Sequence, residues 1–383
     1  MKLNRSLPAA AALLALAACA DQTPTALRAT DAAPLLSAGN AIPGRYVVVL
    51  REGADPRSVA AVAGVHPRYV YTAALNGFAA GLNAGQLNAL RHNPAVEYVE
   101  ADQAFEAQTT QSGATWGLDR IDQRNRPLSG TYTYTSTGAG VYAYVIDTGL
   151  QANHPQFGTR AANVFDAFGG TGADCNGHGT HVAGTIGSTT YGVAKSVQLR
   201  GLRALDCNGS GSTSGIIAAV DWVRVNRTNP AVANMSVGGG FSSSLNTAVT
   251  NLANSGVFVA VAAGNSNADA CNYSPASAPA AFTTASSESS DAKRSSSNWG
   301  SCVDAYAPGG SITSTWINSG TSTISGSSMA SPHVAGVAAL YKATYGNATT
   351  ATIDTWIKNN ATLNVITGNV TGTPNRLLYK AAL

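Results

Sequence analysis

Three short and almost uninterrupted apolar runs constrain the fold of this chain more than any other feature. They span residues 141–146, 231–235 and 257–263, and a polar residue follows each run directly or one position later. Strands that are apolar on both faces are typical of a parallel sheet that helices cover on both sides. Helix-like stretches at residues 213–224 and 244–255 lie between the runs. We therefore expect a three-layer α/β domain with a mostly parallel sheet and a functional site where the strands end.

A smaller unit is expected before this domain, at residues 42–108. Its apolar runs and helix-like stretches follow the order βαββαβ, with a hairpin turn expected at Asn76 and Gly77, so we predict a ferredoxin-like α+β domain. Residues 20–41 show no periodicity and are expected to form a linker. The stretch at residues 109–115 is rich in Thr, Gln, Ser and Gly, and we expect it to be flexible and open to cleavage.

The charge content limits the partners of this protein. Charged residues make up 11% of the 383 residues and the net charge is +3, whereas about 25% is usual for a globular chain. Binding of nucleic acid needs clustered Lys and Arg to neutralise phosphates, and no such cluster is present, so we expect no nucleic-acid partner. A hydrophobic content of 44% also argues against disorder.

The N-terminus is typical of an exported protein. Lys2 and Arg5 precede an apolar run at residues 7–18, which is too short to remain as a membrane-spanning helix. The run ends in Leu-Ala-Ala-Cys, which resembles a bacterial lipoprotein cleavage site with Cys19 as the lipid-accepting residue. The alternative is an ordinary signal peptide with a chance Cys. We expect residues 1–19 to be a lipoprotein-type signal peptide and the protein to be secreted.

Export changes the interpretation of the other four cysteines. Cys175, Cys207, Cys271 and Cys302 form an even set in an oxidising compartment, which favours two disulfides. A structural zinc site is the alternative, but the chain has no Cys-x-x-Cys pair. Three pairings are possible, and we favour the sequential one. It closes two loops of about 30 residues, each contributing about 3 to 4 kcal/mol in a chain-entropy model.

Several polar residues with catalytic chemistry follow the apolar runs or begin a helix. Asp147 ends the first run, Asn265 follows the third, and Ser328 lies among small residues at the start of an apolar helix. His178 and His181 lie where a Gly-rich loop enters another helix; this spacing suits a metal, but no nearby Glu completes a zinc-hydrolase pattern. Taken singly, these residues are equally typical of turns, helix caps and buried structural groups. Together they indicate nucleophilic catalysis by serine.

Three motifs carry these residues, and together they resemble the subtilisin-like serine proteases, most closely the proteinase K and aqualysin branch. They are Val-Ile-Asp-Thr-Gly at residues 145–149, His-Gly-Thr-His-Val-Ala-Gly-Thr at 178–185 and Gly-Ser-Ser-Met-Ala at 326–330. The resemblance covers residues 116–379. The family usually has Thr where this chain has Ser327, which keeps a hydroxyl group and a small size.

This resemblance implies a secreted serine endopeptidase of broad specificity, with a three-layer subtilisin-like domain at residues 109–383. It implies that Ser328 is the nucleophile, that His178 is the general base, that Asp147 orients the imidazole and that Asn265 binds the oxyanion. Backbone hydrogen bonds would hold an extended polypeptide substrate, with a neutral pocket for apolar or aromatic side chains. The residues that the resemblance assigns to this binding are Asn208, Gly209, Ser236, Val237, Gly238 and Gly239.

Structural calcium is common in the family. By resemblance, the carboxylate of Asp304 and the carbonyl groups of Pro279 and Ala281 form a calcium site, and oxygen ligands suit this hard cation. The cysteine positions also match the aqualysin-type disulfides, which have the sequential pairing favoured above.

Residues 42–108 resemble the inhibitory propeptide of these proteases. We expect this propeptide to assist folding and to inhibit its own enzyme until self-cleavage near Gln108 and Thr109. If Cys19 carries a lipid, only the precursor is tethered to the membrane, and the released enzyme is expected to be a monomer. Two other classes of protein fit these residues less well. A catalytically dead binding protein has no need of the intact catalytic set, and an α/β-hydrolase esterase has its Ser in Gly-x-Ser-x-Gly, before the Asp and His.

Overall fold

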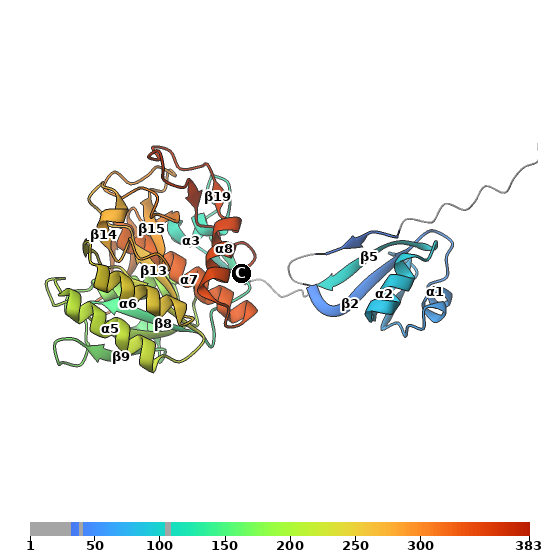
Figure 1. Ribbon diagram of the computed structural model, residues 1–383, viewed down its shortest axis with the longest axis horizontal. Helices are drawn as coiled ribbons and strands as arrows, with labels where there is room; N and C mark the ends of the chain where they lie inside the picture. The colour runs from blue at the N-terminus through green and yellow to red at the C-terminus, as the bar shows by residue number, and fades with distance from the viewer. Residues whose placement is uncertain (1–31, 38–40, 104–108) are drawn as a thin grey trace, which may run out of the picture. The chain divides into compact units, whose positions relative to one another are not determined.

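The computed structural model describes residues 32–37, 41–103 and 109–383 of the chain. These residues form two compact units that divide after Glu106 (Figure 1). The expected signal peptide with Cys19 lies outside the described residues, as does the Gln108 side of the expected cleavage bond. No helix in the described ranges is both long and apolar enough to span a bilayer.

The smaller unit is a five-stranded sheet with two helices packed against it, and its strand order is β1-β5-β2-β4-β3. Val48, Phe78 and Val99 of the sheet pack against Val59 and Leu90 of the helices, and this is the core of the unit. The elements are β1 Leu35–Leu36, β2 Ala41–Leu50, α1 Pro56–Val62, β3 Tyr69–Tyr71, β4 Gly77–Gly81, α2 Ala84–Arg91 and β5 Val96–Gln103. From β2 to β5 they follow the order βαββαβ, so the predicted ferredoxin-like α+β fold is confirmed.

Two details of the small unit differ from the sequence-based expectation. Part of the expected linker is a strand, because Leu35–Leu36 pairs in parallel with the edge strand β5 and covers backbone groups that would otherwise be open. The expected turn at Asn76 and Gly77 is also misplaced, since residues 72–76 form the connection and Gly77 already pairs with Tyr71. Glycine is needed in this strand because a Cβ at Gly77 would collide with a backbone carbonyl oxygen of β2.

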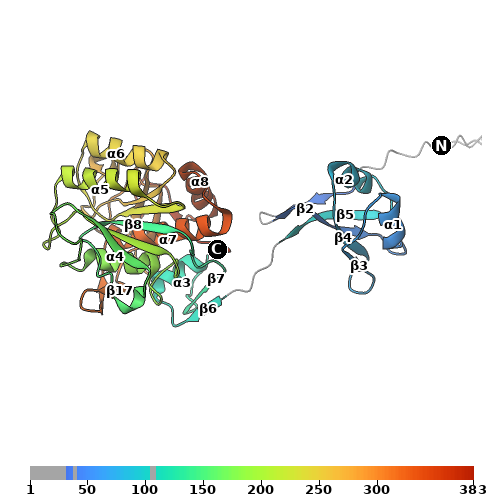
Figure 2. The same cartoon turned by 90° about the horizontal axis from the view of Figure 1, so that it is seen from below.

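The larger unit is built on a nine-stranded sheet in the order β19-β20-β16-β15-β13-β11-β8-β10-β9. All its pairings are parallel except that of β19 with β20. Figure 2 shows α5 and α6 on one side of β8, with α4 and α7 on the other. The predicted three-layer fold is therefore confirmed.

The strands of this sheet are β8 Tyr142–Asp147, β9 Ala161–Asp166, β10 Gln198–Arg203, β11 Ala231–Met235, β13 Phe258–Ala262, β15 Phe282–Ser287, β16 Ala305–Pro308, β19 Thr362–Leu363 and β20 Arg376–Leu377. The helices are α3 Trp116–Asp122, η1 Pro155–Phe157, α4 His178–Gly187, α5 Thr213–Asn226, α6 Ser243–Asn254, η2 Ala270–Asn272, α7 Ser327–Tyr345 and α8 Thr350–Asn360. Three small two-stranded sheets pair β6 Thr109–Ser112 with β7 Thr131–Tyr134, β12 Gly239–Gly240 with β14 Tyr273–Ser274, and β17 Ile312–Trp316 with β18 Gly320–Ile324.

The apolar runs are continuous because the central strands serve two different cores. In β8, Ala143 and Val145 enter the core that α4 and α7 cover, while Tyr144 and Ile146 enter the core beneath α5 and α6. All four side chains are buried. A strand with both faces buried has no position for a solvent-facing polar residue, which explains why this segment lacks an alternating pattern.

The stretch after the unit boundary is more ordered than the sequence suggested. Residues 109–115 were expected to be flexible, but Thr109–Ser112 forms β6 and pairs antiparallel with β7. The prediction is therefore wrong for these four residues, because β-branched Thr side chains favour a strand where a partner edge is present. Gln111 Nε2 also donates a hydrogen bond of 3.0 Å to the carbonyl oxygen of Thr190.

The four cysteines of the larger unit form two disulfides. Cys175 bonds to Cys207, and Cys271 bonds to Cys302, which is the sequential pairing. The first disulfide joins the loop before α4 to the segment after β10.

Two of the buried histidines in the larger unit stay neutral at physiological pH. His181 on α4 and His333 on α7 are 0% and 1% exposed. Burial lowers the pKa of each imidazole to about 4, although hydrogen bonds to the carbonyl oxygens of Ile312 and Met329 raise it in part.

We predict that the stability of the larger unit falls as the pH decreases from 6.5 towards 4. In this range the unfolded chain binds protons at His181 and His333, whereas the folded imidazoles do not, and each contributes a slope of about 1 kcal/mol per pH unit. Replacing His333 by Gln, which keeps a donor for the carbonyl group of Met329, is expected to remove about half of this slope. Urea unfolding of both proteins at several pH values, with Ser328 replaced by Ala to prevent self-digestion, measures the difference. Equal slopes for the two proteins would contradict the prediction.

Candidate active site

Three neighbouring strands deliver polar residues to one edge of the large sheet. β8, β11 and β13 are adjacent and parallel, so their carboxyl ends lie together. Asp147 is the last residue of β8, Ser236 follows β11, and Asn265 follows β13 by three positions. His178 begins α4 and Ser328 lies in the first turn of α7. The structure therefore brings Asp147, His178, Asn265 and Ser328 to the same edge of the sheet, together with Ser236.

Asp147 and His178 form a directly hydrogen-bonded pair. The distance from His178 Nδ1 to Asp147 Oδ1 is 2.7 Å, and the same oxygen accepts a bond of 2.8 Å from the backbone N–H of Thr148. The carboxylate can only accept, so Nδ1 carries the proton and the neutral imidazole keeps Nε2 free as a base. Asp147 is 0% exposed, whereas the His178 side chain is 25% exposed.

The protonation of His178 reflects two opposing effects. Burial lowers its pKa, but the charge of Asp147, the hydrogen bond to Asp147 and the charge of Asp174 together raise it above the usual value of 6.5. An imidazole with a raised pKa accepts a proton readily. His178 is thus neutral and able to act as a base only at pH values above this raised pKa.

Glycines allow the two halves of this pair to approach each other. A Cβ on Gly179 would collide with the carbonyl oxygen of Gly149, in the turn directly after the strand that carries the carboxylate. Gly177, the N-cap of α4, has a φ of 111° and faces the ring of Trp316, which leaves no space for a side chain. The glycines that flank the first histidine of the motif are therefore required by this close approach.

Ser328 lies where the first N–H groups of α7 have no partner within the helix. Its Oγ donates to the carbonyl oxygen of Ser236 at 3.2 Å, and Ser236 Oγ donates back to the carbonyl oxygen of Ser328 at 2.8 Å. These two bonds tie α7 to the end of β11.

The side chain of Asn265 is oriented by the same helix. Its Oδ1 accepts a bond of 2.8 Å from the backbone N–H of Ser327, which leaves the Nδ2 amide as a donor. A Cβ on Gly326 would lie 3.3 Å from this Nδ2, so glycine keeps the space beside the amide open. The hydroxyl of Ser327 accepts a bond of 3.0 Å from the N–H of Gly264. These contacts were not predicted from the sequence, although the small residues around Ser328 are a signal for them.

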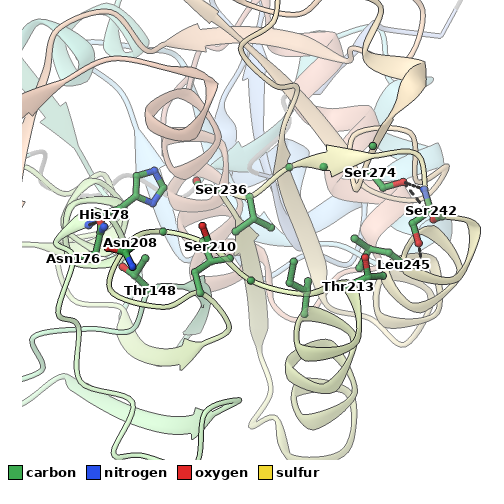
Figure 3. A pocket seen from close by; sticks show the side chains of 18 residues that line it. Thr148, Asn176, His178, Asn208, Ser210, Thr213, Ser236, Ser242, Leu245 and Ser274 are labelled. Atoms are coloured by element: carbon green, nitrogen blue, oxygen red, sulfur yellow. Dashed lines mark hydrogen bonds between the residues drawn. The ribbon is translucent and has the colours of Figure 1, made fainter.

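A groove extends from His178 between two facing segments, residues 208–211 and 236–240. It has a volume of about 580 Å³, and all six residues expected to bind substrate line it. Figure 3 shows His178 at one end of the groove and Leu245 at the other. An adjoining cavity of about 240 Å³ has Asn265 and Ser328 in its wall, and no charged side chain lines it.

The metal-binding alternative for His178 and His181 has no support in the structure. His181 Nε2 lies 3.0 Å from the carbonyl oxygen of Ile312 and 3.2 Å from that of Ser322, within the buried core. Among the residues that the structure describes, no group of three or more His, Cys, Asp or Glu side chains is arranged to hold a metal ion.

The expected calcium site at Asp304 does not fit the structure. Asp304 Oδ1 lies 2.7 Å from the ammonium group of Lys358, and its Oδ2 accepts a bond of 2.7 Å from the backbone N–H of Thr283. Lys358 also pairs with Asp354 at 2.8 Å. Both carboxylate oxygens thus have partners, and a cation beside Oδ1 would meet the positive charge of Lys358. The expectation that Asp304, Pro279 and Ala281 hold calcium is therefore corrected.

The fold and this site together define a serine hydrolase built on a three-layer α/β domain. Residues 138–378 match the subtilase family, and residues 45–108 match the peptidase inhibitor I9 family. The extracellular serine proteinase of a Thermus species is 51% identical over 398 residues, which cover 96% of this chain and 97% of that protein. Proteinase R of Parengyodontium album is 46% identical over 360 residues, which cover 91% of this chain and 92% of that protein.

A solved structure agrees with these matches. The crystal structure of a cold-adapted subtilisin-like serine proteinase superposes with a TM-score of 0.70 at 53% identity, and the match covers 71% of this chain and 100% of that chain. This chain belongs to the subtilase family. It is accordingly a serine endopeptidase, with an I9 propeptide before the peptidase domain.

We predict that Lys358 takes the role of a bound cation at Asp304. A chelator is expected to change the melting temperature of the wild type no more than that of the Asp304→Asn variant, because no calcium is bound at Asp304. The Lys358→Met variant, which keeps the apolar stem, is expected to melt several degrees lower, because Asp304 loses its partner, and to be stabilised by added calcium. Differential scanning calorimetry with and without chelator measures both effects. A chelator-induced loss of stability in the wild type that the Asp304→Asn variant lacks would overturn this prediction.

Proposed function

We propose that Ser328, His178, Asp147 and Asn265 carry out peptide hydrolysis in the larger unit. The observation that carries this proposal is the 2.7 Å hydrogen bond between Asp147 and His178, at the end of a groove whose adjoining cavity has Ser328 and Asn265 in its wall. These four groups provide a nucleophile, a base, an orienting carboxylate and an oxyanion donor, which is a complete set for acyl transfer.

The first half of the reaction forms an acyl-enzyme. Ser328 Oγ attacks the carbonyl carbon of the scissile bond while its proton moves to His178 Nε2. The resulting oxyanion accepts hydrogen bonds from the Ser328 backbone N–H and from Asn265 Nδ2, which are held in place before the reaction begins. The C–N bond then breaks, and His178 gives the proton to the leaving amine.

The second half releases the acid product. A water molecule attacks the ester carbon and passes a proton to His178, and the C–O bond to Ser328 breaks as the serine takes that proton back. Throughout, the carboxylate of Asp147 stabilises the positive imidazole by charge and keeps the Nδ1 proton in place. Each group ends the cycle in the protonation state in which it began.

The groove favours an extended peptide as substrate. Segments 208–211 and 236–240 offer backbone groups on its two sides, and backbone hydrogen bonds tolerate many sequences. The adjoining cavity lacks charged side chains, so we propose broad specificity with a preference for apolar or aromatic residues before the cleaved bond.

We further propose that the chain is made as a secreted, self-processing precursor. In this proposal residues 1–19 are a signal peptide, 20–41 a linker, 42–108 an intramolecular inhibitor and 109–383 the monomeric enzyme. The I9 match at residues 45–108 supports the inhibitor, and the similarity to the extracellular serine proteinase of a Thermus species supports secretion. A lipid on Cys19 would tether only the precursor, since the cleavage separates Cys19 from the peptidase domain.

We predict that the Ser328→Ala variant folds but neither processes itself nor digests casein, because the nucleophile is lost. The wild type is expected to cut itself near residue 108, and the Asn265→Ala variant to process itself with turnover lowered about a hundredfold to a thousandfold. Ser212→Ala is the matched control, because Ser212 also lies at a helix start and caps it, accepting from the N–H of Gly215, and its other side-chain contact is with the hydroxyl of Ser214. This control is expected to lose about 1 kcal/mol of stability and no activity.

Mass spectrometry of each full-length chain and a casein assay provide the measurements. A wild-type chain that folds but stays intact and inactive would contradict the proposed function and favour a binding protein. Activity in the Ser328→Ala variant would reject Ser328 as the nucleophile.

A further inference from the structure

The start of α4 depends on side chains from outside the helix. Its N-cap is Gly177, which has no side chain to accept hydrogen bonds from the first turn. Asn176 Oδ1 accepts from the N–H of His178 at 3.2 Å, and Thr148 Oγ1 accepts from the N–H of Gly179 at 2.8 Å. Figure 3 shows Thr148 and Asn176 close to His178 at the end of the groove.

Asp174 provides the remaining and most extensive part of this cap. Its Oδ2 accepts from the N–H and the Oγ1 of Thr180, at 2.9 and 2.6 Å. Its Oδ1 accepts from Thr148 Oγ1 and from the N–H groups of Asn176 and Gly177, each at 2.9 Å. One carboxylate therefore satisfies five donors, of which one belongs to the turn after β8 and the others to the start of α4 and the loop before it.

Thr148 makes this arrangement relevant to catalysis. Its N–H donates to Asp147 Oδ1, and its Oγ1 both donates to Asp174 and accepts from Gly179. Asp174 thus holds the residue that follows the buried carboxylate and, by its other oxygen, the helix turn that begins with His178. Apart from Asp147 itself, no other side chain in the described part of the chain has a hydrogen bond both to Thr148 and to the first turn of α4.

We propose that Asp174 is a positioning residue for the Asp147–His178 pair, which joins the two elements that carry it and places a second negative charge near the imidazole. This inference rests on the proposed function of the pair. It assigns no contact with substrate to Asp174. Its charge lies at the N-terminus of α4, where a negative group is also favourable for the helix dipole.

Two charged groups act on His178, and both are carboxylates. Asp147 lies on β8, Asp174 lies in the loop before α4, and His181, on the same helix, is neutral because burial lowers its pKa to about 4. On the neighbouring strand β10, Arg203 pairs with Asp166 at 3.4 Å. Both carboxylates near His178 raise its pKa, so loss of either charge is expected to lower it.

The test compares Asp174→Asn with wild type in the pH dependence of kcat/KM for a peptide ester and a peptide amide. An Asn has one oxygen for five donors and no charge. We expect kcat to fall about tenfold with little change in KM, since the pair is misplaced while the groove is intact. We also expect the acidic limb of the profile to move to lower pH.

Asp166→Asn is the matched control. Asp166 also accepts two backbone N–H groups, those of Phe168 and Gly172, and it pairs with Arg203, but it has no bond to Thr148 or α4. This variant is expected to lose stability while its pH profile and kcat stay as in the wild type. An equal shift of the acidic limb in both variants would assign the effect to net charge and overturn the proposal.

A second pair of variants tests the same link if Asp174→Asn does not fold or process itself. Thr148→Val removes the hydroxyl from a buried position at constant shape, and Thr148→Ser retains it. We expect kcat to fall in Thr148→Val, whereas Thr148→Ser is expected to keep most of the wild-type kcat. If the wild-type enzyme is active and kcat is unchanged in Asp174→Asn or in Thr148→Val, the proposed role of Asp174 is rejected, whereas the proposed function still stands. An inactive wild type would instead reject the proposed function.

Discussion

A buried carboxylate at the end of a strand is the constraint on which the site depends. Asp147 is fully buried, and a buried charge is costly unless hydrogen-bond donors surround it. Its two donors are the Nδ1 of His178 and the N–H of Thr148, from two different elements. The start of α4 must therefore lie against the end of β8, and Gly149 and Gly179 permit this contact. The need to provide hydrogen-bond donors for this one buried charge thus sets the position of His178.

The second half of the site depends on the rigidity of α7. Almost every residue from Ser327 to Lys342 is buried, so the helix packs against the sheet along most of its length. Its first N–H groups consequently keep a fixed direction, and Asn265 is tied to the same turn through the N–H of Ser327. Donors that are fixed before the reaction stabilise a developing oxyanion without a cost for reorganising them. The burial of α7 therefore fixes the direction of the N–H groups at its start, which are the groups that would face the oxyanion.

The features that the sequence predicts well depend on local patterns. The run at residues 141–146 predicts a strand buried on both faces, because few other environments accept so many consecutive apolar residues. The motifs around Asp147, His178 and Ser328 indicate the site because each combines a reactive group with the small residues that its close surroundings require. The pattern at Asn76 and Gly77 misleads for the same reason, since a local turn signal carries no information about the carbonyl group that β2 presents there.

Contacts between distant segments could not be predicted in this way. Asp304 has the chemistry of a calcium ligand, and only the tertiary structure brings Lys358 of α8 to it. Thr109–Ser112 becomes a strand only because β7 offers an edge, and Asp174 gains its role only beside Thr148. The sequence by itself therefore determined the class of fold and the order of most elements, and it indicated the residues that we propose as the reactive groups of the site. The tertiary structure decided which partner each polar group has, because that choice depends on distances in space that positions along the chain do not contain.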